Sequence, residues 1–196
     1  MTDIDPIAAA TVAFEASVAS GHDWLAMYTT GRGDGWVGLV QPASDPIERA
    51  AQVVLTAVAV QDKTGTLPTR ARMILDSYVR AYEPDEVPAD IADAPRPKED
   101  PKASEAMMIV EADADAGVVR AGHRTYAWGD DGAFRWTADE VHWIGTKPLA
   151  VTHAMDPMEV AVASAVTEGA QPPDFVTGLG DSDLAEFGIT IGRVEF

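Results

Sequence analysis

The sequence predicts an α+β fold, in which a helical N-terminal part is followed by an antiparallel sheet, a meander with one covering helix. Three observations predict it. Asp-Pro pairs typical of helix starts recur along the chain, an acidic proline-rich segment interrupts the pattern, and the apolar residues beyond it alternate with a period of two. We expect three parts: 1–83, mainly helical; 84–105, an acidic Pro-rich linker or long loop; and 106–196, an antiparallel sheet plus helix.

Each Asp-Pro pair predicts the start of a helix, because Asp caps the first amides and Pro has no N–H to leave unsatisfied. The pairs are Asp5-Pro6, Asp45-Pro46 and Asp156-Pro157. Glu159 completes a capping box with Asp156, and Gly65 is a candidate stop for the second helix, which we expect over 46–61. A further helix is predicted after Pro68, where apolar residues recur at helical spacing up to Tyr82.

The remaining elements are predicted from shorter patterns. Residues 24–28 suggest a short turn, and 36–40 suggest a strand. After the linker, period-two alternation predicts strands over 107–111, 118–128, 133–137, 140–144 and 149–153, and a last strand over 187–196 that returns to this sheet. The helix over 157–168 should cover the sheet.

The register of one hairpin can be predicted from its turn. Residues 130–132, Asp-Asp-Gly, fit a three-residue loop whose glycine takes the left-handed conformation. Trp128 then faces Phe134 and Tyr126 faces Trp136, so that all four aromatic side chains lie on one side. If the next strand continues the meander, its apolar residues at 141 and 143 join this aromatic face.

The opposite side of the hairpin carries candidate metal ligands, His123, Glu140 and His142. Imidazoles bind metals and titrate near neutral pH, and a carboxylate can orient them. A small enzyme or metal-binding protein using this His/Glu face is therefore one hypothesis. The competing interpretation is a solvated sheet face, because no metalloprotease-type spacing links the residues.

A second acidic pattern lies between two of the predicted strands. Glu111, Asp113 and Asp115 alternate with alanine and lead to Gly117. A calcium loop would need its glycine one position earlier and a glutamate where Gly122 stands. We therefore expect a hairpin loop with an acidic rim.

Composition excludes several functions. The chain has 32 acidic and 14 basic residues, and its net charge of −18 argues against nucleic acid and membrane partners. Without cysteine it has neither disulfides nor a thiolate metal site. The acidic first residues lack the basic region of a signal peptide, and no apolar stretch is long enough to span a membrane, so we expect a cytoplasmic location.

The strongest functional signal is the distribution of charge near the C-terminus, where no Lys or Arg occurs between Lys147 and Arg193. The predicted partner-binding residues are Asp174, Phe175, Asp181, Asp183 and Glu186. They predict a soluble non-catalytic acidic protein-binding protein: an adaptor, an assembly subunit or an immunity-type inhibitor of a basic partner. No catalytic residue or cofactor is predicted, and oligomeric state stays open. DNA mimicry, halophilic adaptation and simple solubility are alternative explanations of the charge.

Overall fold

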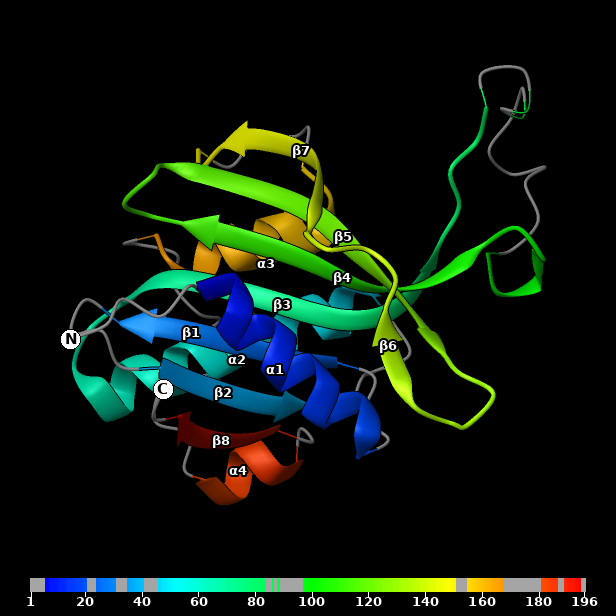
Figure 1. Cartoon of the computed structure of the whole chain (residues 1–196). Helices are drawn as coiled ribbons and strands as arrows, with labels where there is room; N and C mark the ends of the chain where they lie inside the picture. Colours follow the sequence, from blue (N-terminus) through cyan, green and yellow to red (C-terminus); the bar gives the residue numbers. More distant parts are fainter. Residues whose placement is uncertain are drawn as a thin grey trace.

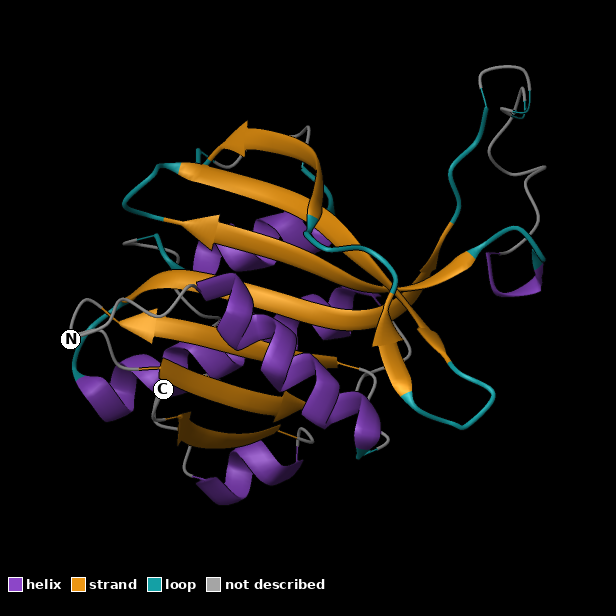
Figure 2. Cartoon of the chain, viewed as in Figure 1, coloured by secondary structure: helices purple, strands orange, loops and turns teal. Residues whose placement is uncertain are grey.

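An antiparallel sheet of eight strands organises the computed structural model, with helices on both of its faces (Figures 1 and 2). The structure describes residues 6–20, 24–30, 35–40, 46–83, 86, 88, 97–150, 155–167, 181–186 and 189–194. This arrangement of helices and antiparallel strands confirms the predicted α+β class.

The strands lie in the order β6-β5-β4-β3-β1-β2-β8, and β7 also pairs with β5. They are β1 (Trp24–Thr30), β2 (Gly35–Val40), β3 (Pro68–Val79), β4 (Ser104–Asp113), β5 (Val118–Trp128), β6 (Phe134–Trp136), β7 (His142–Pro148) and β8 (Ile189–Val194). The helices are α1 (Pro6–Ala19), α2 (Pro46–Thr64), α3 (Pro157–Ala165) and α4 (Asp181–Glu186), with a 3₁₀ turn, η2, at Pro97–Glu99. None of the helices in the described ranges combines the length and apolar character that crossing a membrane requires.

The three helices predicted from Asp-Pro pairs are confirmed. In α3 the carboxylate of Asp156 accepts hydrogen bonds from the backbone N–H groups of Met158 and Glu159, and the Glu159 carboxylate accepts one from Asp156 N–H. The helix therefore has the predicted capping box. α2 runs beyond the predicted end to Thr64 and stops at Gly65, which has a φ of 68°.

The helix predicted after Pro68 is wrong, because this segment is the long strand β3. β3 pairs with β1 on one side and β4 on the other, so it lies inside the sheet. Apolar side chains point to both faces of it: Met73 packs toward α2 and α3, and Ile74 packs toward α1. A strand covered on both faces loses the visible period of two, which is why helical spacing could be read from it.

The turn predicted at residues 24–28 is also wrong, since these residues belong to strand β1. The predicted strand over 36–40 is confirmed as β2. The last strand is confirmed as β8, and it pairs with β2, at the opposite end of the sheet from β6. Of the predicted strand over 149–153, residues 151–153 lie outside the described residues, and the other two form a bend.

The sheet includes strands from both sides of the predicted linker, because β3 pairs with β4. Within 84–105 only residues 86, 88 and 97–105 are described. Asp100 is buried, although an exposed segment was predicted. Its carboxylate accepts hydrogen bonds from Arg80 and from the backbone N–H of Lys102. The end of this segment is therefore held against β3, and its last two residues already belong to β4.

The predicted hairpin register is confirmed. Tyr126 pairs with Trp136 and Trp128 with Phe134, and Gly132 has a φ of 72°. The Tyr126 and Phe134 rings stack with centroids 4.7 Å apart. The apolar residues at 141 and 143 do pack against this aromatic cluster, although β7 pairs with the first half of β5 rather than with β6. β6 and β7 thus follow one another along β5.

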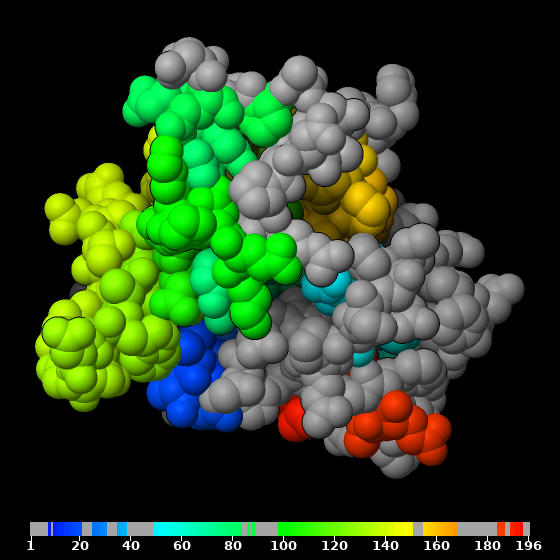
Figure 3. Space-filling model, turned by 90° about the vertical axis from the view of Figure 1, so that its right-hand side faces the viewer, coloured from blue at the N-terminus to red at the C-terminus, as the bar shows by residue number. Residues whose placement is uncertain are grey.

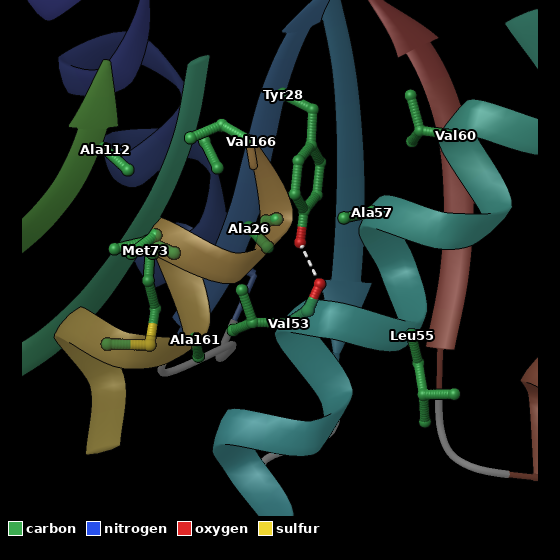
Figure 4. Close-up of a cluster of buried hydrophobic side chains, with 14 of the residues drawn as sticks. Ala26, Tyr28, Val53, Leu55, Ala57, Val60, Met73, Ala112, Ala161 and Val166 are labelled. Atoms are coloured by element: carbon green, nitrogen blue, oxygen red, sulfur yellow. Dashed lines mark hydrogen bonds between the residues drawn. The ribbon is translucent and has the colours of Figure 1, made fainter. Parts of the chain in front are cut away.

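The two faces of the sheet have separate cores. On one face α2 and α3 cover Tyr28, whose hydroxyl donates a hydrogen bond of 2.6 Å to the carbonyl of Val53 (Figure 4). Burial raises the pKa of this hydroxyl, so Tyr28 stays neutral. On the other face α1 places Phe14 against Tyr126, with ring centroids 5.7 Å apart. Helices on both faces therefore stabilise the sheet.

The contact of β2 with α2 generates the first prediction. A Cβ atom added at Gly38 would lie 2.5 Å from Cγ2 of Thr56, whose rotamer is held by a hydrogen bond to the carbonyl of Gln52. Gly38→Ala should lower the free energy of unfolding by about 1–3 kcal/mol, as overpacking does. Chemical denaturation measures this effect.

Gly192 in the neighbouring strand β8 is the matched control. A Cβ atom there would meet nothing within 4 Å. Gly192→Ala should leave stability unchanged or raise it slightly, because alanine restricts the unfolded chain. If the two substitutions change stability equally, the close contact between β2 and α2 does not exist.

Candidate functional site

The two predicted histidine ligands come together across the β5–β7 pair. His123 and His142 are direct partners in the ladder, and their rings lie 5.3 Å apart between centroids at an angle of 61°. Glu140 is exposed just before β7. No group of three or more His, Cys, Asp or Glu side chains within the described ranges is arranged to hold a metal ion. The histidines therefore meet as a pair.

The surroundings of His123 favour its neutral form. Burial lowers the pKa of His123, and the neighbouring His142 lowers it further. Nearby polar groups satisfy one another: the hydroxyls of Thr125 and Thr137 are 2.8 Å apart, and Arg135 binds Asp131. Arg135 is thus engaged within the hairpin turn.

The predicted partner-binding residues are only partly described. Asp174 and Phe175 lie outside the described residues. Asp181, Asp183 and Glu186 belong to α4, which packs beside β8 through the buried Leu184. This acidic helix therefore lies at the sheet end opposite the aromatic hairpin (Figure 1).

The acidic rim predicted at Glu111 and Asp113 is wrong, since both carboxylates are buried. Glu111 has no exposed surface and binds two guanidinium groups, those of Arg72 and Arg120. Asp113 binds Arg70 at 2.5 Å. Only Asp115 is exposed as expected. A charged cluster, not a loop rim, therefore occupies these strands.

Strand register assembles this cluster. Arg70 is opposite Asp113, Arg72 is opposite Glu111, and Glu111 is opposite Arg120 on β5. The indication in the sequence was an Arg-x-Arg pair and a Glu-x-Asp pair, each with the period of a strand. A helical interpretation of β3 conceals that match.

Other cations in the described chain are also bound internally. Arg120 stacks on Trp143 at 4.0 Å, and Arg124 stacks on Trp136 at 4.2 Å. Arg80 binds Asp100, and Lys147 binds Glu159 of α3 at 2.5 Å. In contrast, several exposed carboxylates take part in no ion pair among the described residues: those of Asp62, Asp115, Asp130, Asp139 and Glu140. Many of the cations thus bind buried carboxylates or tryptophan rings, and several exposed carboxylates have no cationic partner among the described residues.

A second feature is an exposed apolar surface, which we call the α1–hairpin surface. It consists of the outward side of α1, with Ala8, Val12, Ala16 and Ala19, and the aromatic hairpin, with the exposed Trp128 and the half-buried Phe134 and Trp136. Val12 is 66% exposed and Trp128 is 45% exposed. The indole N–H of Trp136 donates to Glu15 of α1, which makes the two parts continuous. In Figure 3 the yellow-green hairpin projects beside the blue atoms of α1.

Comparison with protein-family models, with curated proteins and with solved structures finds no match.

The buried cluster generates a prediction about stability. Glu111→Gln leaves two guanidinium groups beside a neutral amide in a buried position, so it should lower the free energy of unfolding by about 3–5 kcal/mol. The control is Asp131→Asn, which breaks a solvent-exposed pair and should lower the free energy of unfolding much less. Similar losses in urea denaturation would show that Glu111 is not buried between cations.

Asp113 predicts an acid dependence. Burial alone would raise its pKa, but hydrogen bonds from the backbone N–H of Ala116 and from Arg70 outweigh burial and hold the pKa below its ordinary value. Its contribution to stability is therefore present above the unfolded-state pKa, about 3.9, and is lost as pH falls through the lower folded-state pKa. Asp113→Asn should make stability fall less steeply below about pH 4. An unchanged acid slope would contradict this assignment.

Proposed function

We propose that this chain is a non-catalytic acidic protein-binding protein, acting in the cytoplasm as an adaptor, an assembly subunit or an immunity-type inhibitor of a basic partner. The α1–hairpin surface carries the proposal. It joins exposed apolar side chains to surrounding carboxylates, which is the chemistry that a basic amphipathic partner would complement.

The apolar part of the surface supplies binding energy. α1 is apolar on its outward side as well as its inward side, a pattern typical of a helix covered on both sides. Only the inward side, with Phe14, is covered by the sheet among the described residues. Trp128 adds a large aromatic side chain of the kind that dominates interface energetics. A partner that covers Val12 and Trp128 would remove both from water.

The charged part of the surface selects the partner. Glu15, Asp130, Asp139 and Glu140 are exposed around the aromatic hairpin and the outer side of α1. A second copy of the chain would bring its own negative charge to this rim, whereas a basic protein would bring the opposite charge. We therefore infer a basic partner rather than a homodimer.

A synthetic amphipathic helix made of leucine and lysine is a suitable probe. By fluorescence anisotropy the protein should bind it, and should bind a leucine and glutamate helix at least about tenfold more weakly because of like-charge repulsion. The double variant Val12→Ser/Trp128→Ser should weaken binding of the lysine peptide by about tenfold or more. Rising ionic strength should slow association, since the Debye length shortens.

Ile144 provides the matched control, because it is 58% exposed but lies on β7, outside the α1–hairpin surface. Ile144→Ser should leave affinity within about twofold. If Ile144→Ser weakens peptide binding as much as Val12→Ser/Trp128→Ser does, the α1–hairpin surface is not the binding site. Dimerisation that Trp128→Ser abolishes in light scattering would replace the basic partner with a second copy.

Removing charges from one region at a time shows whether the hairpin rim or the acidic residues of α4 attract the partner. If the hairpin rim attracts the partner, Asp139→Asn/Glu140→Gln should weaken the peptide complex more than Asp181→Asn/Asp183→Asn does. A larger effect at α4 would show that the partner binds the acidic residues predicted from the sequence, and not the α1–hairpin surface. Equal effects per charge would mean that only the global charge matters.

A further inference from the structure

We propose that His123 and His142 form a two-histidine site for a divalent transition metal such as Zn²⁺, bridging strands β5 and β7. Water or an exogenous ligand would fill the remaining coordination positions. This inference is independent of the proposed protein-binding function, because it rests on a different part of the sheet.

The spacing of the two rings fits a shared metal. Zn–N distances are about 2.1 Å, so each imidazole centroid lies about 3.2 Å from a bound ion. Two such ligands at a tetrahedral angle have centroids about 5.2 Å apart. The observed separation is 5.3 Å, and the 61° angle between the rings shows that they are not stacked face to face. The separation of the rings is therefore compatible with a shared ion.

The pairing of β5 with β7 fixes the backbone positions of the two histidines. His123 and His142 are opposite one another, and the register shift between Ala121 and Gly122 leaves Ile144 out of the ladder. This irregularity changes which side of β7 each later residue faces. Trp143 packs with the aromatic cluster around α1, so the neighbouring His142 points to the opposite side, where His123 lies.

The chemistry of the two side chains also suits a metal. Imidazole is a good ligand for zinc, copper and nickel. A bound ion would connect β7 to β5, adding to the tie that Lys147 makes from β7 to Glu159 of α3. Zinc should therefore raise the melting temperature of the folded chain.

The test uses the full chain with His22 and His153, the other histidines of the sequence, replaced by glutamine. After treatment with EDTA, calorimetric titration with Zn²⁺ alone should show one ion bound, and the imidazole ¹⁵N signals of both His123 and His142 should shift. His123→Gln and His142→Gln should each lower zinc affinity by roughly tenfold or more, because one imidazole remains. Far-ultraviolet circular dichroism of each variant checks that it is folded.

Glu140→Gln is the matched control, and it should leave zinc affinity within about twofold since a two-histidine site does not use this carboxylate. Three outcomes would overturn the proposal: no binding at millimolar zinc, binding that both histidine variants retain, or a loss in Glu140→Gln equal to that in the histidine variants. The last result would indicate a three-ligand site instead.

Discussion

Glu111 is the residue on which the central sheet depends. Its carboxylate is completely buried and is shared by Arg72 of β3 and Arg120 of β5, the strands on either side of β4. A buried charge without partners is destabilising. A shift of one residue in either ladder would move an arginine away from Glu111 and so destabilise the fold. These two ion pairs thus favour the observed register of β3, β4 and β5, in addition to the apolar cores.

This internal use of arginine explains the character of the surface. A chain with few cations places many of them against buried carboxylates or over tryptophan rings, as Arg124 lies over Trp136. Several exposed carboxylates then have no cationic partner among the described residues, and with a net charge of −18 the protein presents a negative field to its surroundings. Apolar side chains such as Val12 and Trp128 lie within that field, which connects the folding energetics to the proposed recognition of a basic partner.

The two proposed sites occupy opposite sides of the β5–β6–β7 region. The aromatic side chains pack on the α1 side, while His123 and His142 meet on the other. His142 and Trp143 lie on different faces because successive residues of a strand point to opposite sides of the sheet. Metal binding and protein binding would therefore use different side chains, on opposite faces of the sheet.

Local signals in the sequence determined the caps and the hairpin. Asp156 with Glu159, and the glycine of the 130–132 turn, act over a few residues, so the capping box and the aromatic register could be predicted. The hairpin turn placed His123 and His142 on one side of the sheet, but their direct pairing comes from the β5–β7 ladder, which the turn does not set. Glu140 does not join them within the described chain, because the turn before β7 leaves it exposed.

Tertiary structure alone decided the rest. β3 is a strand because β1 and β4 pair with it and helices cover both its faces, which no local pattern in residues 68–79 specifies. Burial of Glu111 likewise depends on residues far along the chain, since Arg72 is 39 positions away. Long-range pairing can override helical spacing because burying both faces of a strand stabilises it more than intrinsic propensity does.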